Sequence, residues 1–215
     1  MNNCYLDAEA VITFFRMTGR KHIFITGSRG SGKSHLVNNM LKHMSDSFNL
    51  LQSHRTDTPQ VVIKSNLVAD NKEFVIGVPR TSGINPASKG NNMTIIEDGF
   101  INCAIPAIDT HLDTTPERLF VIDELGYLES SCIPFQKAVE KLLDNSHVLA
   151  VIRKQSTEFL NRICNRKDVL VIDIDSTFET LSCIIMASGM SKRFGSNKLI
   201  TDFNGRSLFE NAVSI

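Results

Sequence analysis

Apolar and polar positions follow two different spacings along this chain. Short, nearly continuous apolar runs are typical of buried strands, and they occupy residues 21–26, 60–64, 73–78, 118–123, 147–152 and 168–174. In other segments apolar side chains recur every three or four positions, which predicts amphipathic helices over 6–17, 35–44, 134–145 and 156–166.

The order of these segments predicts the fold class. From residue 118 onward apolar runs and helical patterns alternate, which indicates a three-layer α/β sandwich with right-handed crossovers. Because strands covered on both faces are apolar throughout, we predict a mostly parallel sheet. Residues 79–92 are rich in Pro, Gly, Ser and Asn, and they predict a long mobile loop.

The composition excludes several classes of protein. Lys plus Arg and Asp plus Glu each number 23 among 215 residues, so no net charge draws the chain toward nucleic acid or an acidic membrane. We expect neither as a partner. No apolar run reaches the roughly 18 residues of a membrane span, and MNNCYLDAEA lacks the pattern of a secretory signal. The five widely spaced cysteines are expected to be reduced thiols, several of them in the core, of a cytoplasmic protein.

Residues 27–34 read GSRGSGKS and follow the first predicted strand. They fit the phosphate-binding pattern G-x-x-x-x-G-K-[ST], in which glycines let backbone N–H groups surround a phosphate. Lys33 would reach the β- and γ-phosphates, Ser34 would bind Mg²⁺, and the following helix would direct its positive N-terminus at the phosphates. We predict that the nucleotide is bound by Gly27, Ser28, Arg29, Gly30, Ser31, Gly32, Lys33, Ser34 and His35.

Two carboxylates end the apolar run at 118–123. Asp123 is the predicted outer-sphere ligand of the Mg²⁺, because an acid at the carboxyl end of a neighbouring strand faces the loop. Glu124 would orient and partly deprotonate the attacking water. With Lys33, these two acids form the predicted catalytic set, and they favour hydrolysis over transfer to a small substrate. The alternative is that both only cap the next turn.

Three stretches together resemble the cancer-related nucleoside-triphosphatase family: GSRGSGKS, LFVIDELGYLE at 119–129, and residues 134–174. The resemblance covers about residues 20–175 and is weak from 51 to 117. It implies a P-loop NTPase fold and Mg²⁺-dependent hydrolysis of several nucleoside triphosphates to the diphosphate and phosphate. Tyr127 stands where the family usually has Lys. The family's nucleotide-contacting residues carry over at Gly32, Lys33, Ser34, Asp123 and Glu124.

Three other charged residues have two interpretations each. Arg153 follows a strand where the family places a basic residue, so it either stabilises γ-phosphate charge or is an exposed arginine at a strand end. Asp173 and Asp175 alternate along VIDID and share one face of a strand. They either hold a metal or end the strand at the surface, and we favour the surface.

A second glycine-bearing basic loop lies at 184–199, IIMASGMSKRFGSNKL. It resembles the opening of the MobA-like nucleotidyltransferases, in which Arg and Lys neutralise the phosphates of a nucleoside triphosphate. The resemblance implies a truncated, Rossmann-like nucleotidyltransferase start at 179–215, after a P-loop domain at 1–178. The alternative is an ordinary last strand and helix of the first domain. The residues that carry the pattern are Gly189, Ser191, Arg193, Gly195 and Lys198.

The expected function combines these features. We expect Mg²⁺-dependent hydrolysis of ATP, GTP, CTP or UTP by a P-loop domain joined to an incomplete MobA-like module, which does not transfer nucleotides by itself. A molybdopterin-type substrate would bind only through the rest of that module. The alternatives are a bifunctional molybdenum-cofactor nucleotidyltransferase with a regulatory P-loop domain, a P-loop small-molecule kinase, and a nucleotide-gated binding protein.

Overall fold

The computed structural model describes residues 6–44, 47–80, 93–176, 202–203 and 206–207. The chain divides into two compact units, Met1–Phe178 and Glu179–Ile215. In the second unit the described residues form two short antiparallel strands, β9 (Asp202–Phe203) and β10 (Arg206–Ser207). The predicted loop over 79–92 lies almost entirely outside the described residues.

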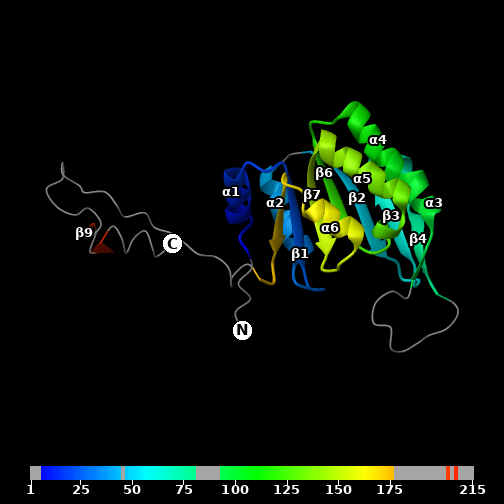
Figure 1. Ribbon diagram of the computed structural model, residues 1–215, viewed down its shortest axis with the longest axis horizontal. Coiled ribbons are helices and arrows are strands. Elements are labelled where there is room, and N and C mark those ends of the chain that lie inside the picture. The colour runs from blue at the N-terminus through cyan, green and yellow to red at the C-terminus, as the bar shows by residue number, and fades with distance from the viewer. Residues whose placement is uncertain (1–5, 45–46, 81–92, 177–201, 204–205, 208–215) are drawn as a thin grey trace. The chain divides into compact units, whose positions relative to one another are not determined.

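An eight-stranded sheet forms the centre of the first unit, in the order β5-β4-β3-β2-β6-β7-β1-β8 (Figure 1). The strands β2, β6, β7, β1 and β8 run parallel, and β3, β4 and β5 extend the sheet antiparallel beyond β2. The predicted α/β fold with a mostly parallel sheet is therefore confirmed. The strand bounds are β1 His22–Gly27, β2 Phe48–Arg55, β3 Val61–Ser65, β4 Phe74–Pro79, β5 Met93–Ile95, β6 Leu119–Leu125, β7 His147–Arg153 and β8 Val169–Asp173.

Helices cover both faces of this sheet. On one face lie α1 and α2, and on the other lie α4, α5 and α6 (Figure 1). The helical bounds are α1 Ala8–Thr18, α2 Lys33–Met44, α3 Glu97–Gly99, a π-helical turn Phe100–Ala104, α4 Ile105–Thr114, α5 Ile133–Asn145 and α6 Glu158–Cys164. Short 3₁₀ turns occupy Ala69–Asn71 and Glu129–Ser131.

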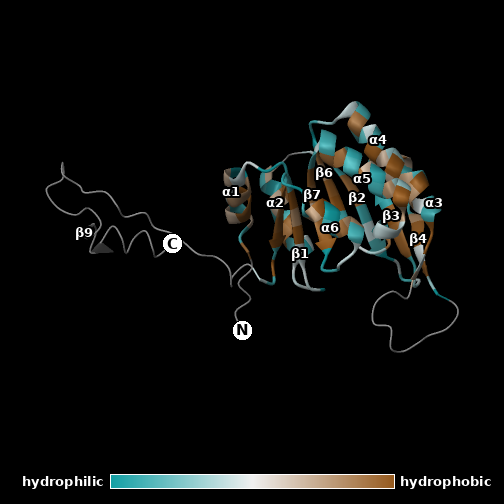
Figure 2. Cartoon of the chain, in the orientation of Figure 1, coloured by the Kyte–Doolittle hydropathy of each residue, from teal (hydrophilic) through white to brown (hydrophobic). Residues whose placement is uncertain are grey.

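Strand β1 shows how the sheet separates two cores. Ile23 and Ile25 pack with α1 and α2, whereas Phe24 between them packs with the helices of the opposite face. Apolar side chains therefore occupy both faces of the central strands. These strands are coloured as hydrophobic in Figure 2. Cys103 and Cys132 are buried free thiols in the larger core, in agreement with the expected core role. None of the helices among the described residues is long and apolar enough to cross a membrane.

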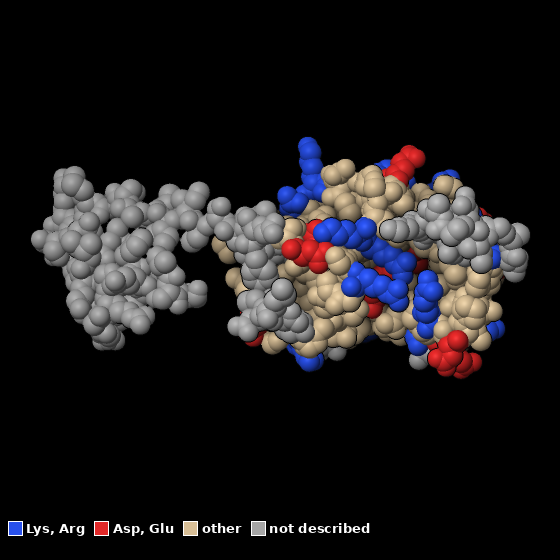
Figure 3. Space-filling view, turned by 90° about the horizontal axis from the view of Figure 1, so that it is seen from below, with Lys and Arg blue, Asp and Glu red and all other residues tan. Residues whose placement is uncertain are grey.

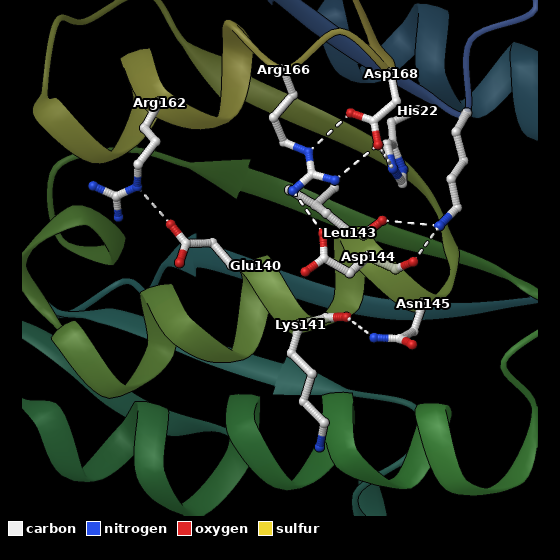
Figure 4. Close-up of polar contacts among 10 residues, drawn as sticks. His22, Glu140, Lys141, Leu143, Asp144, Asn145, Arg162, Arg166 and Asp168 are labelled. Atoms are coloured by element: carbon white, nitrogen blue, oxygen red, sulfur yellow. Dashed lines mark hydrogen bonds and ion pairs between the residues drawn. The ribbon is translucent and has the colours of Figure 1, made fainter.

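A charged network joins the amino ends of β1 and β8 to α5 (Figure 4). Arg166 donates to Asp168 through Nε and Nη2, at 3.0 and 2.8 Å, and its Nη1 pairs with Asp144 at 2.9 Å. Lys21 donates to the backbone carbonyls of Leu143 and Asp144, which lie at the carboxyl end of α5. A cation at this end stabilises the helix, because the last carbonyls lack partners within it.

Candidate active site

The predicted phosphate-binding loop connects β1 to α2, as the strand–loop–helix pattern requires. Gly32 has φ 94°, in the left-handed region that favours glycine. A Cβ on Gly27 would lie 2.7 Å from Ile174 Cγ1 and 2.8 Å from Ser31 Oγ, so only glycine fits there without displacement. The backbone N–H of Leu36 donates to the carbonyl of Gly32 at 2.9 Å, and α2 begins within the loop. Its N-terminus therefore faces the site where a phosphate would bind.

Lys33 folds back over this loop. Its Nζ donates to the carbonyls of Gly27 and Ser28, each at 2.8 Å. It forms no ion pair with the acids of the described residues. Burial raises the pKa of Asp123, and the charge of Lys33 opposes part of that rise. The ammonium group is thus held by neutral carbonyls, which an incoming phosphate oxygen can replace.

Asp123 and Glu124 lie at the carboxyl edge of the sheet, where the phosphate loop also lies. Their strand, β6, was predicted to be a neighbour of β1, and it is not. Strand β7 lies between β6 and β1. The acids still face the loop because parallel strands place their carboxyl ends together. Burial raises the pKa of Asp123, and a long contact of 3.4 Å from Gln52 Nε2 to Asp123 Oδ2 opposes that shift.

The intervening strand supplies the partner of Glu124. Arg153 is the last residue of β7, and its Nε forms an ion pair with Glu124 Oε1. The Arg153 side chain is 42% exposed. Arg153 lines the cavity over the phosphate loop. It is also partly open to solvent at the end of its strand, so the structure has features of both interpretations of this residue.

The capping role considered for Asp123 and Glu124 falls to another acid. Glu129 Oε2 accepts a hydrogen bond of 2.9 Å from the N–H of Gly126, in the turn that follows β6. The residue is only 5% exposed, and burial raises the pKa of its carboxyl to about 7. The motif LFVIDELGYLE contained Glu129, but its spacing alone gave no sign of this buried contact.

Asp173 and Asp175 flank one cation. Lys154 Nζ lies 2.9 Å from Asp173 Oδ2 and 3.0 Å from Asp175 Oδ2. Asp175 Oδ2 also accepts from the N–H and the hydroxyl of Ser28, at 2.7 and 2.6 Å. Asp175 therefore fixes the start of the phosphate loop. The described residues hold no cluster of three or more His, Cys, Asp or Glu side chains suited to a metal.

These elements enclose a cavity of about 780 Å³ over the loop. The loop residues 27–35 form its floor, and Glu124, Arg153, Lys154, Gln155 and Arg55 line the rest. Lys and Arg side chains gather at the centre of this face (Figure 3). The excess of positive charge suits a polyphosphate. Arg55 was not predicted, because the sequence of β2 carries no motif.

The residues present fit Mg²⁺ carried by a triphosphate. Mg²⁺ needs only one or two protein ligands beside phosphate and water oxygens. Ser34 stands in the first turn of α2. Asp123 is a desolvated carboxylate with a long contact of 3.4 Å to Gln52 Nε2. A divalent cation would satisfy that carboxylate.

The second predicted nucleotide loop, with Gly189, Ser191, Arg193, Gly195 and Lys198, lies outside the described residues. Its resemblance to MobA-like proteins stays a prediction that rests on sequence pattern alone.

The parallel sheet, the glycine loop and the charged cavity at the carboxyl edge define the class of P-loop nucleoside triphosphatases. Within that class the chain belongs to the NTPase family, which matches residues 22–179. The expected family is thus confirmed over nearly the expected range.

Known proteins agree with this assignment. The chain is 26% identical over 155 residues to the nucleoside-triphosphatase THEP1 of Thermotoga sp. (strain RQ2), covering 71% of this chain and 86% of that protein. It is 23% identical to THEP1 of Thermotoga maritima, with coverage of 71% and 86%. The fold resembles the crystal structure of THEP1 from Aquifex aeolicus, with a TM-score of 0.57, 17% identity and coverage of 73% and 92%. It also resembles the solution structure of a human cancer-related nucleoside triphosphatase, with a TM-score of 0.53, 20% identity and coverage of 71% and 88%.

Proposed function

We propose that this chain hydrolyses nucleoside triphosphates to the diphosphate and inorganic phosphate, with Mg²⁺ bound to the nucleotide. The supporting observation is that Lys33 and Glu124, one cation and one carboxylate, face the same positively charged cavity over the phosphate loop. Glu124 is half of an ion pair at the rim of that cavity, where an attacking water would enter. The names of the THEP1 relatives support the same activity.

The residues divide the work as follows. Backbone N–H groups of residues 27–34 and the N-terminus of α2 bind the phosphates. Lys33 exchanges the carbonyls of Gly27 and Ser28 for β- and γ-phosphate oxygens. Mg²⁺, held by Ser34 and Asp123, would supply charge neutralisation between the phosphates. Glu124 orients the water and accepts its proton as the oxygen attacks the γ-phosphorus.

The test measures phosphate release from ATP, GTP, CTP and UTP with Mg²⁺. We expect release by the wild type, and a loss of at least about a hundredfold in Lys33→Ala and in Glu124→Gln. Glu124→Gln should still bind the diphosphate, because the amide keeps the shape of the side chain. A wild type that binds nucleotides without releasing phosphate would contradict the proposal and favour a nucleotide-gated binding protein.

The alternatives make different products. A small-molecule kinase would place the phosphate on an acceptor, so phosphate absent from solution but present on an added acceptor would favour it. For residues 179–215 we propose the start of a MobA-like module, on the sequence pattern alone. We expect no nucleotidyl transfer by the purified 215-residue chain, and observed transfer would contradict this expectation.

A further inference from the structure

Arg55 stands where β2 ends beside the two catalytic carboxylates. In the parallel pairing of β2 with β6, Gln52 is aligned with Asp123. One residue further along β2, Ser53 Oγ lies 3.4 Å from both the N and the O of Glu124. Arg55 is the last residue of β2, three residues beyond the pair Gln52–Asp123 and still paired with Val61 of β3. It therefore lies at the same end of the sheet as Glu124, although the two residues are far apart in the sequence.

The position of Arg55 is shared by two hollows. The large cavity over the phosphate loop adjoins a small pocket of about 40 Å³, and Arg55, Glu124 and Arg153 line both. Tyr127 lines the small pocket. Burial raises the pKa of its phenol, and the charges of Arg153 and Arg55 oppose that shift. The Arg55 guanidinium is thus close to the part of the cavity where Glu124 would hold water.

Apart from Arg29 of the phosphate loop, the other Lys and Arg side chains that line the cavity already have partners. Arg153 pairs with Glu124, Lys154 pairs with Asp173 and Asp175, and Lys33 is held by loop carbonyls. Within the part of the chain that the structure describes, the exposed Arg55 side chain forms no ion pair or hydrogen bond. An unpaired guanidinium beside a phosphate loop and a water-holding carboxylate is available for an anion.

We propose that Arg55 is a further catalytic residue, whose guanidinium binds oxygens of the γ-phosphate and stabilises the charge that develops during transfer. This inference rests on the proposed hydrolysis. In that step the water oxygen forms a bond to the γ-phosphorus, and its proton goes to Glu124. The bond from the γ-phosphorus to the bridging oxygen breaks, and its electron pair stays on the diphosphate. A planar guanidinium can bind two equatorial oxygens at once.

The experiment compares Arg55→Ala and Arg55→Lys with Arg16→Ala. Arg16 is an exposed arginine of α1 that does not line either hollow, so its loss is the matched control. For each protein one measures kcat, KM, the affinity for the nucleoside diphosphate, and the affinity for the diphosphate with Mg²⁺ and aluminium fluoride, which mimics the transferring phosphoryl group. Diphosphate binding also shows that each variant is folded.

We expect Arg55→Ala to lower kcat by at least about a hundredfold, because arginines that contact a transferring phosphoryl group contribute about 10³–10⁵. Its diphosphate affinity should stay within about twofold, and the extra affinity given by aluminium fluoride should be lost. Arg55→Lys should restore little of kcat, since a point charge lacks the paired donors. Arg16→Ala should behave as the wild type.

Other results separate the two proposals. A wild type that releases no phosphate would overturn the proposed hydrolysis and this inference with it. An active wild type together with an Arg55→Ala variant whose kcat is within about threefold would overturn this inference alone. A third result would also overturn this inference, namely an unchanged kcat with kcat/KM and diphosphate affinity reduced by the same factor. Arg55 would then bind the substrate and the transition state equally strongly.

Discussion

The carboxylate of Glu124 and the guanidinium of Arg153 form an ion pair between the ends of the adjacent strands β6 and β7. Gly126 determines the space around this pair. A Cβ at Gly126 would lie 2.9 Å from Arg153 Cδ, closer than such atoms normally approach. The glycine in the turn after β6 therefore lets Arg153 reach Glu124.

Gly126→Ala is expected to displace Arg153 and to lower kcat about tenfold or more, with diphosphate affinity nearly unchanged. The reason is steric, and the effect depends on the presence of Arg153. In an Arg153→Ala background the same substitution should cost little more, since the crowded side chain is gone. A double-mutant cycle of phosphate release measures this coupling. Additive effects of the two changes would contradict it.

Asp175→Asn is expected to weaken triphosphate binding by about three- to tenfold. Asp175 Oδ2 accepts from both the N–H and the hydroxyl of Ser28. The amide oxygen of Asn is a weaker acceptor than a carboxylate, so the loop must be ordered at the expense of binding. The matched control is Asp173→Asn, which alters the other carboxylate beside Lys154. Titration of nucleotide affinity in the two variants gives the comparison, and equal losses would show that Lys154 alone matters.

The fold was predictable because its central strands are apolar runs. The strand predicted before the phosphate loop and the strands predicted from residue 118 onward agree closely with β1, β6, β7 and β8. Strands β2 and β5 and the helical region from Glu97 to Thr114 were not predicted. Strand β2 reads FNLLQSHR, with polar residues in its second half, and the helical region from Glu97 to Thr114 is interrupted by Gly99 and Pro106. Neither segment presents the spacing of an exposed helix or a buried strand.

The site was predictable only where one continuous stretch carries it. GSRGSGKS gives the loop, and the end of an apolar run gives Asp123 and Glu124. The order of strands in the sheet is decided by pairing over long separations, so β7 between β6 and β1 could not be read from local spacing. Arg55 depends on the register between β2 and β6, in which Gln52 and Asp123 are 71 residues apart.

His22 is expected to make the folded state less stable as the pH falls. It is fully buried, and its Nε2 lies 3.4 Å from Asp168 Oδ2 (Figure 4). Burial lowers the pKa of His22 to about 4, against 6.5 for the ordinary group. Between these values the unfolded chain binds a proton that the folded chain does not. Stability should therefore decrease by about 3 kcal/mol from pH 6.5 to 4. Urea unfolding at several pH values should show that the stability difference between the wild type and His22→Gln changes by about 3 kcal/mol from pH 6.5 to 4, because the variant lacks this contribution. A difference that stays constant with pH would contradict the prediction.

Glu129 is expected to act in the opposite direction over nearly the same range. Burial raises the pKa of its carboxyl to about 7, against 4.5 for the ordinary group. Between these values the folded chain keeps a proton that the unfolded chain has lost, so stability should decrease by about 3 kcal/mol as the pH rises. The two residues thus largely cancel in the wild type. Glu129→Gln, which can still accept from the Gly126 N–H, should therefore become more stable from pH 4.5 to 6.5, whereas His22→Gln should become less stable from pH 4.5 to 7. Parallel urea titrations that gave the two variants slopes of the same sign would show that another group controls the pH dependence.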